Sequence, residues 1–109
     1  MTEKEALCWV AGIVEGEGCF TLHSKYHPYF LLDMCDLDVL ERVKQVFPFV
    51  NLRGPYYNKK KPDHKARYRV DAFGPKAVQI MEALYPFLLK RRQQKIEELL
   101  HIWRTNPNV

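Results

Sequence analysis

Two spacings of hydrophobic residues alternate along this chain and divide it into eight elements. Apolar residues that recur every three or four positions predict helices, and strict alternation of apolar and polar residues predicts strands. The first helix is predicted over about 3–16, where Thr2 and Glu5 are spaced as a capping box. The other expected elements are strands at 19–26 and 29–35, a helix capped by Asp36 or Asp38 that ends at Pro48, strands at 50–57 and 67–73, a helix between the Gly74-Pro75 break and Pro86, and a last helix over about 87–103.

The order of these elements, α-β-β-α-β-β-α-α, predicts the fold class. Two hairpins separated by a helix favour an α+β fold in which a four-stranded antiparallel sheet carries helices on one face and leaves the other face open. We expect residues 1–109 to form one such domain.

The open face of this sheet would collect basic, amide, aromatic and acidic side chains. As a set they suit the reading of base edges together with contacts to phosphate, and a two-stranded ribbon fits the major groove of DNA. Each of them taken alone is equally well an ordinary solvated strand residue, and the lysine run at the tip of the second hairpin is equally well a solvated loop. The candidate DNA-binding residues are Thr21, His23, Lys25, Tyr29, Asp33, Asn51, Arg53, Tyr57, Lys59, Lys60, Lys61, Arg67, Arg69 and Asp71.

Composition narrows the classes of protein. A net charge of +4 over 109 residues permits a polyanionic partner without demanding one. Three cysteines without a Cys-x-x-Cys pair argue against a disulfide framework or a structural zinc site and favour a reducing compartment. No apolar run reaches the roughly 20 residues of a membrane span, and the acidic segment at residues 2–5 is not typical of a signal peptide. We therefore expect a soluble intracellular protein with no membrane partner.

The end of the first helix breaks several rules of helix stability. Gly12 lies within the apolar pattern, where glycine is about 1 kcal/mol less favourable than alanine. Gly12 and Gly16 share a helix face without side chains, which lets another backbone approach closely. Glu15 and Glu17 lie at the negative end of the helix dipole, where each carboxylate is unfavourable by roughly 0.3–1 kcal/mol. Something outside the chain is expected to compensate for them.

Residues 10–18, followed by Cys19-Phe20, resemble the motif of the LAGLIDADG homing endonucleases, with EGEG in place of DADG. The predicted order of elements is similar to that family's fold over about residues 5–100. The resemblance implies a saddle-shaped sheet over double-stranded DNA, a dimer or pseudodimer packed through the two motif helices, and divalent-metal-dependent cleavage of both strands.

The resemblance also implies roles for residues of the motif. Glu17 matches the catalytic carboxylate, and it would bind Mg²⁺ or another divalent cation together with the Gly16 carbonyl oxygen. Glu15 matches the first acid, which is nearer a structural role at the helix end. The residues expected at the dimer interface are Ala11, Gly12, Ile13, Glu15 and Gly16.

Two further site residues are implied outside the motif. The family places a basic residue after a proline-leucine segment near the last helix, in a pattern like P-x-L-x-x-K-R-x-Q; here Arg91 stands at the lysine position, with Lys90 one residue away. An arginine there would stabilise phosphate charge but would not readily deprotonate to act on water. Asp36 corresponds to a polar site residue in some relatives, and it is equally well interpreted as a simple N-cap.

These inferences predict a site-specific double-strand DNA endonuclease that acts as a homodimer on a near-palindromic site. The main alternative is a non-cleaving nucleic-acid-binding protein of the same fold, such as a maturase or a regulator. In a third interpretation the resemblance is superficial and the glycine face serves only protein dimerisation. A single motif in the chain means that one subunit holds half of any cleavage site.

Overall fold

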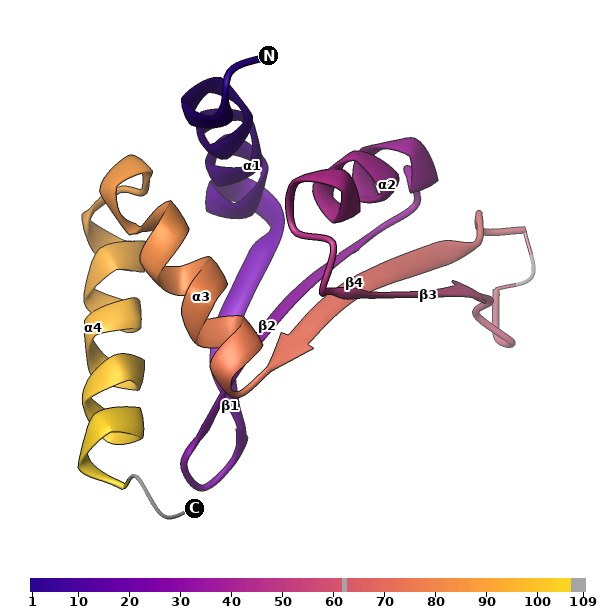
Figure 1. Cartoon of the computed structure of the whole chain (residues 1–109). Coiled ribbons are helices and arrows are strands. Elements are labelled where there is room, and N and C mark those ends of the chain that lie inside the picture. The colour runs from indigo at the N-terminus through magenta and orange to yellow at the C-terminus, as the bar shows by residue number, and fades with distance from the viewer. Residues whose placement is uncertain (62, 107–109) are drawn as a thin grey trace.

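The computed structural model describes residues 1–61 and 63–106, and its elements follow the expected order (Figure 1). A short 3₁₀ helix, η1, is added before the last helix. The elements are α1 (Glu3–Glu17), β1 (Gly18–Ser24), β2 (His27–Met34), α2 (Leu37–Val46), β3 (Asn51–Tyr56), β4 (Arg67–Phe73), α3 (Pro75–Leu84), η1 (Tyr85–Phe87) and α4 (Lys90–Thr105).

The four strands form one antiparallel sheet in the order β1-β2-β4-β3. Each hairpin predicted from the sequence is present, and β2 and β4 join the two hairpins at the centre of the sheet. The outer hairpin of β3 and β4 extends past α2 as a two-stranded arm (Figure 1). The α+β class and the four-stranded antiparallel sheet are confirmed.

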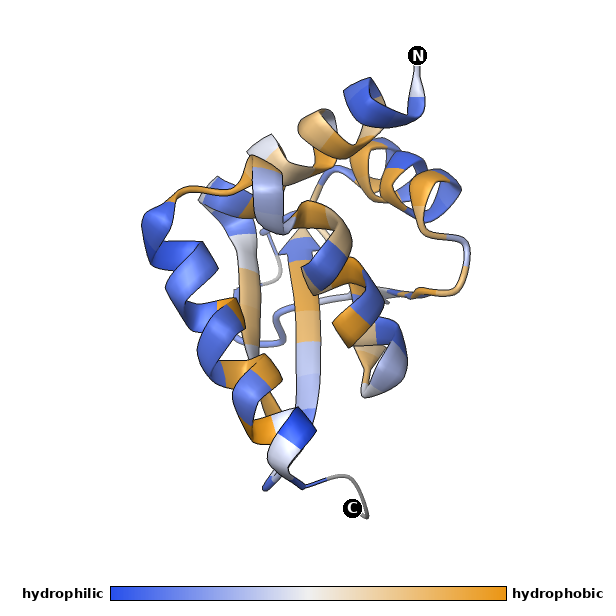
Figure 2. Ribbon diagram, turned by 60° about the vertical axis from the view of Figure 1, so that its left-hand side comes forward, coloured by the Kyte–Doolittle hydropathy of each residue, from blue (hydrophilic) through white to orange (hydrophobic). Residues whose placement is uncertain are grey.

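The helices cover one face of the sheet because every second strand residue is apolar. Phe30 and Leu32 in β2 and Val70 and Ala72 in β4 are fully buried, and they pack with apolar positions of all four helices. Figure 2 shows the hydrophobic positions of α4 on its side toward the strands and a hydrophilic outer side. Burial of this alternating face drives the sheet and helices together and leaves the opposite face free of helices.

Several boundaries differ from the sequence expectation, and the clearest differences are at the first hairpin and at α4. β2 begins at His27 instead of residue 29. β1 ends at Ser24, because Lys25 and Tyr26 form a tight turn that the Ser24 hydroxyl closes against His27 Nδ1 at 2.6 Å. α4 begins at Lys90 instead of residue 87, because Pro86 lies in η1 and the chain after it is extended at Leu88.

β3 is irregular between Arg53 and Tyr56. Gly54 there has φ of +125°, a conformation that favours glycine, and a Cβ atom on it would lie 2.9 Å from the Arg67 carbonyl oxygen. The irregularity ends the simple alternation of β3, so Tyr57 lies beyond the strand and not on its open face as expected.

Within 1–61 and 63–106, every helix is too short or too polar to span a bilayer.

Candidate functional site

The two acids at the end of α1 have different surroundings. The Glu15 carboxylate accepts a hydrogen bond of 2.9 Å from the backbone N–H of Leu89, the residue that caps the start of α4. The Glu17 side chain is exposed, and in the described part of the chain it makes no hydrogen bond or ion pair. Glu15 therefore joins two helices, whereas Glu17 is left available.

The start of α4 is held against the foot of α1 by a second contact. Arg92 Nη2 donates to the Glu15 carbonyl oxygen over 3.3 Å, and the Arg92 side chain is partly buried. Arg91, the residue that the family pattern indicates, is exposed and lies two residues from the Leu89 contact. The structure thus brings the α4 start beside the motif and leaves the Arg91 guanidinium on the surface.

The glycine face of α1 is open. A Cβ atom on Gly12 or Gly16 would meet no atom of the described chain within 4 Å, so these glycines are not required by packing within one chain. Ile13 is partly exposed. Ala11, in contrast, is 1% exposed and belongs to the core, so the expectation that it lies at a dimer interface is wrong. Its position turns it toward the sheet together with Val10 and Val14.

Asp36 lies at the same end of the sheet as Glu17. Gly18, which follows Glu17, pairs with Leu32 in β2, and Asp36 follows the end of that strand. The Asp36 side chain makes no capping hydrogen bond to α2, although the residue occupies the N-cap position. Asp36 is exposed, and the interpretation of its side chain as a helix cap does not hold.

The oxygen atoms at this foot are those that a hard cation binds. Glu17 offers a carboxylate and Gly16 a backbone carbonyl, and both residues are exposed. No group of three or more His, Cys, Asp or Glu side chains in the described ranges converges into a metal site. One chain offers one carboxylate and one carbonyl oxygen at this foot, and Mg²⁺ commonly takes one or two carboxylates plus phosphate oxygens while it keeps several waters.

The open face of the sheet has three rows of side chains that cross the strands. The register places residues of neighbouring strands directly opposite one another, where their side chains interact. The rows are Thr21-Tyr29-Phe73, Cys19-Leu31-Asp71-Asn51 and Asp33-Arg69-Arg53.

Asp71 differs from its expected role. It was expected to face DNA, but it is 3% exposed and lies below the side chains around it. It accepts hydrogen bonds from Tyr29 Oη at 3.1 Å and Asn51 Nδ2 at 3.0 Å. Arg53 Nε lies 3.3 Å from its second oxygen and forms an ion pair. A buried carboxylate is stable only with such partners, so Asp71 is a support for its neighbours and not itself a surface contact.

The second acid of this face pairs with the two arginines of β4. Asp33 accepts from Arg69 Nη2 at 3.0 Å, and Arg67 Nε lies 3.5 Å from its other oxygen. Arg67 also donates to the Asp33 carbonyl oxygen at 3.0 Å. This pairing offsets the repulsion between Arg69 and Arg53, which are directly opposite in the sheet.

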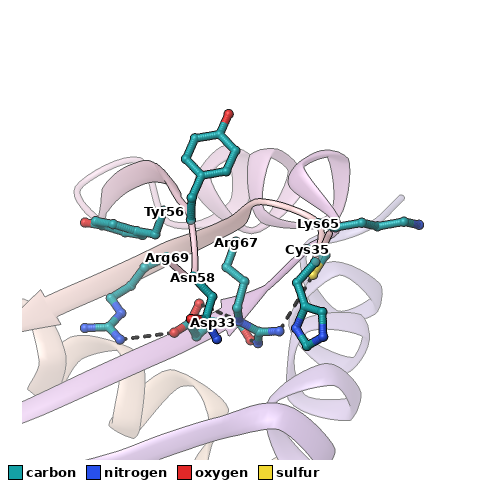
Figure 3. Close-up of a pocket in the computed structure, with 9 residues that line it drawn as sticks. Asp33, Cys35, Tyr56, Asn58, Lys65, Arg67 and Arg69 are labelled. Atoms are coloured by element: carbon teal, nitrogen blue, oxygen red, sulfur yellow. Dashed lines mark hydrogen bonds and ion pairs between the residues drawn. The ribbon is translucent and has the colours of Figure 1, made fainter. Parts of the chain in front are cut away.

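Arg67 and Arg69 line a hollow of about 730 Å³ between the end of β2 and the arm (Figure 3). Tyr56 and Tyr57 at its rim are 49% and 70% exposed. The lining residues are Asp33, Cys35, Tyr56, Tyr57, Asn58, His64, Lys65, Arg67 and Arg69.

Burial and charge shift two titrating groups of the open face. The pKa of Tyr29 is raised above its ordinary value, first by burial and then by the neighbouring Asp71 carboxylate. The pKa of Arg69 is also raised, chiefly by its hydrogen bond to Asp33. Tyr29 therefore stays a neutral hydrogen-bond donor, and Arg69 stays charged.

The remaining expected DNA-binding residues lie at the margins. Lys25 is in the β1–β2 turn, and Lys59, Lys60 and Lys61 are exposed in the loop of the arm. His23 is exposed and its ring lies 4.7 Å from that of Phe73, which stacks on Tyr29 at 4.7 Å.

Sequence reasoning missed Phe73 and Arg92. Alternation from Arg67 would have placed Phe73 on the open face, but its apolar side chain was not considered as a contact. Nothing in the sequence identified Arg92, because its contact to Glu15 depends on how α4 packs against α1.

Comparison with known proteins gives matches among solved structures. No protein-family model matches the sequence, and no curated protein matches it. The chain is similar to the homing endonuclease I-CvuI in complex with the I-CreI target in the presence of Mg, with a TM-score of 0.70 and 18% identity over 97% of this chain and 70% of that chain. It is also similar to the I-LtrWI LAGLIDADG homing endonuclease bound to target DNA, with a TM-score of 0.64 and 17% identity over 98% of this chain and 39% of that chain.

A third similar structure is an archaeal intron-encoded homing endonuclease complexed with DNA, with a TM-score of 0.62 and 14% identity over 95% of this chain and 83% of that chain. At these low identities the comparisons show that the fold is shared and do not by themselves show the function. The chain has the fold of the LAGLIDADG homing endonucleases.

Proposed function

We propose that this chain is one half of a homodimeric, metal-dependent, site-specific DNA endonuclease that hydrolyses phosphodiester bonds in both strands of a near-palindromic site. The single observation that carries this proposal is the exposed Glu17 carboxylate at the end of α1, which has no partner among the residues that the structure describes, whereas the Glu15 carboxylate is held by α4. The similar solved structures include homing endonucleases bound to DNA, which supports the same substrate class.

Glu17 and the Gly16 carbonyl oxygen would hold the divalent cation. When bound, the cation supplies charge neutralisation at the scissile phosphate and activation of a water molecule. Asp36 lies at the same end of the sheet, where it would orient water by accepting a hydrogen bond. Arg91, exposed near the motif, would neutralise phosphate charge in the transition state, and its guanidinium stays protonated throughout.

A second copy of the chain would complete the site. The open Gly12 and Gly16 face allows two α1 helices to approach closely, with Ile13 at the edge of the contact. An isologous contact would bring two Glu17 carboxylates together, and their repulsion favours a bound cation between protein and phosphate. The twofold symmetry of such a pair favours a near-palindromic target.

The open sheet face would bind the duplex. Its arginines and Asn51 suit base edges and phosphates, and the β3–β4 arm is a ribbon of the kind that enters the major groove. Lys59, Lys60 and Lys61, at the end of the arm, would contact the phosphate backbone beyond the bases.

The test is selection of cleaved sites from a randomised duplex library with Mg²⁺, using the wild type and Glu17→Gln in parallel. The proposal expects a defined set of cut sequences for the wild type and none for Glu17→Gln, although both bind the selected duplex. Glu17→Gln is nearly isosteric and exposed, so its fold should be unchanged.

Three results would contradict the proposal in different ways. Binding of a preferred duplex without cutting by the wild type would indicate the non-cleaving alternative. Equal cutting by Glu17→Gln would remove the proposed role of that carboxylate. Dimerisation without any duplex binding would leave protein association as the role of the glycine face.

A further inference from the structure

Asp71 is the only buried charged or polar side chain within residues 1–61 and 63–106 of this chain. Its neighbours on the open face contribute three donor groups from two other strands: Tyr29 from β2, and Asn51 and Arg53 from β3. A carboxylate is an acceptor only, so each of these donors must direct an N–H or O–H inward. The buried acid thereby fixes which edge of each partner faces outward.

The orientation of Asn51 follows directly. Its Nδ2 is bound to Asp71 at 3.0 Å, which leaves Oδ1 and the second amide hydrogen for an external partner. An amide with one free donor and one free acceptor matches N7 and N6–H of adenine in the major groove.

The orientation of Arg53 follows in the same way. Its Nε faces Asp71, and the two terminal nitrogens have no partner in the portion of the chain that the structure describes. The side chain is 47% exposed, so this pair of N–H groups faces solvent. Two parallel donors match O6 and N7 of guanine.

The charge of Asp71 makes Arg53 less suited to simple phosphate binding than to base recognition. The Asp71 carboxylate neutralises Arg53 within 3.3 Å, so Arg53 adds little to the net positive charge that attracts a phosphate backbone. The exposed lysines of the arm, Lys59 to Lys61, are better suited to that role. Arg53 is therefore better suited to directional hydrogen bonds with a base than to general attraction of the phosphate backbone.

We propose that Asp71 is a positioning residue for sequence readout: it holds Asn51 and Arg53 as a fixed pair in which Asn51 reads an adenine and Arg53 a guanine. This inference rests on the proposed function, since it requires a DNA duplex on the open face. The two readers are two residues apart on β3, about 7 Å. This distance is close to two base-pair steps of about 3.4 Å each.

The test is a binding selection from a randomised duplex library without added divalent cation, followed by affinity measurements on all single-base variants of the selected site. Asn51→Ala and Arg53→Ala should each flatten base preference at one position, by about 10- to 100-fold. Asp71→Asn should flatten both of these positions at once. Its affinity for random-sequence DNA should not fall, because the substitution removes a negative charge.

Asp38→Asn is the matched control, because it makes the same chemical change at an exposed position in the first turn of α2, away from the open face. It should leave the two positions read by Asn51 and Arg53 unchanged. In an Asn51→Ala, Arg53→Ala background, adding Asp71→Asn should change base preference no further, since residues that act through one another are not additive. Melting curves check that each variant is folded, and Asp71→Thr replaces Asp71→Asn if the latter does not fold.

The inference is overturned if folded Asp71→Asn or Asp71→Thr keeps both preferences. It is also overturned if Arg53→Ala flattens no base position and instead lowers the salt dependence of binding by about one charge, as loss of a phosphate contact would. If the wild type prefers no duplex sequence, the proposed function itself is contradicted. The wild-type selection is therefore carried out before the variants are compared.

Discussion

The foot of α1 and the open face of the sheet both contain two acidic side chains, but they use them differently. On the sheet, Asp33 and Asp71 are both paired with arginine, and Asp71 is buried beneath its partners. At the foot, Glu15 is bound by a backbone N–H, whereas Glu17 is exposed without a partner in the described ranges. The comparison separates acids that position other groups from an acid that is available to a ligand.

The physical basis of the difference is solvation. An acid that is removed from water requires donors, and those donors are then held in one geometry. An acid at the exposed C-terminal end of a helix keeps its water, experiences an unfavourable dipole and holds nothing in place. The first arrangement suits recognition, and the second suits binding of a cation.

The largest expected effect is on cleavage by Glu17→Gln. Loss of this carboxylate should reduce the single-turnover cleavage rate by on the order of a thousandfold, equivalent to several kcal/mol of transition-state stabilisation. Duplex affinity and melting temperature should stay near wild type, because the exposed side chain makes no hydrogen bond or ion pair within the described chain.

Glu15→Gln is its matched control. A glutamine still accepts the Leu89 N–H; it loses a favourable charge at the start of α4 and an unfavourable one at the end of α1, so stability should change by less than about 1 kcal/mol while cleavage stays within tenfold. Equal loss of cleavage in both variants would end the distinction between the two acids.

The next prediction distinguishes a role of Arg91 in cleavage from a role of Arg92 in stability. Arg91→Ala should reduce cleavage by about 100-fold with little change in stability, since its exposed charge is proposed to act on phosphate. Arg92→Ala should lower the free energy of unfolding by about 1–2 kcal/mol, because it loses the bond to the Glu15 carbonyl and its buried stem. Rates from single-turnover assays and melting curves decide between them. The assignment is reversed if Arg92→Ala is the variant that loses cleavage while remaining stable.

The sequence predicted the elements of both regions better than their contacts. Alternation along β2 and β4 correctly placed Tyr29, Asp33, Arg67 and Arg69 on the open face, because a half-buried strand must alternate. Alternation also placed Asp71 on this face correctly, but it did not predict that the Asp71 side chain is buried, since periodicity says which face a residue is on and not how deeply its neighbours cover it.

The foot of α1 shows the same limit. The position of Glu15 and Glu17 in the helix was evident from the chain, but the contact of Glu15 with Leu89 spans 74 residues and depends on tertiary packing. Ala11 was assigned to the dimer interface by the resemblance to the family motif, although it lies on the buried side of α1 with Val10 and Val14. Local pattern predicts elements, and long-range contacts decide the roles of individual side chains.

A smaller effect concerns the second chain that would complete the foot. Gly12→Leu should raise the dimer dissociation constant by about 10- to 100-fold, because overpacking a close helix contact costs about 1–3 kcal/mol. The fold of one chain should be unaffected, since a Cβ atom there has nothing within 4 Å. Sedimentation across a dilution series measures the change.

Gln79→Leu, an exposed helical position on α3, is the control for added surface hydrophobicity. It should leave the dissociation constant unchanged. A dimer that tolerates Gly12→Leu would show that the two chains associate elsewhere, and the Glu17 carboxylates would then not be brought together by α1.

The smallest expected effect is on the pH dependence of stability, and it tests the interaction of Asp71 with Tyr29. Burial, and then the Asp71 carboxylate, raise the folded-state pKa of Tyr29 above the unfolded value of about 10. A raised folded-state pKa means that the Tyr29 contribution to stability is complete below about pH 10 and is lost as the pH rises through the folded-state value. Tyr29→Phe should therefore be less stable than wild type at neutral pH, by no more than about 1 kcal/mol for one partly exposed hydrogen bond.

This difference should shrink and then vanish as the pH rises above 10, because a phenolate beside Asp71 is repelled. Urea unfolding of both proteins from pH 7 to pH 11 measures the difference directly, and common effects of lysine titration cancel. Tyr85→Phe, which removes a phenol hydrogen-bonded to Glu97 on the helical side, should leave the Tyr29 contribution in place. A stability difference between wild type and Tyr29→Phe that is constant over this range would mean that Asp71 does not act on Tyr29 as a charge. The contrast between a paired acid on the sheet and a free acid at the helix foot would then rest on burial alone.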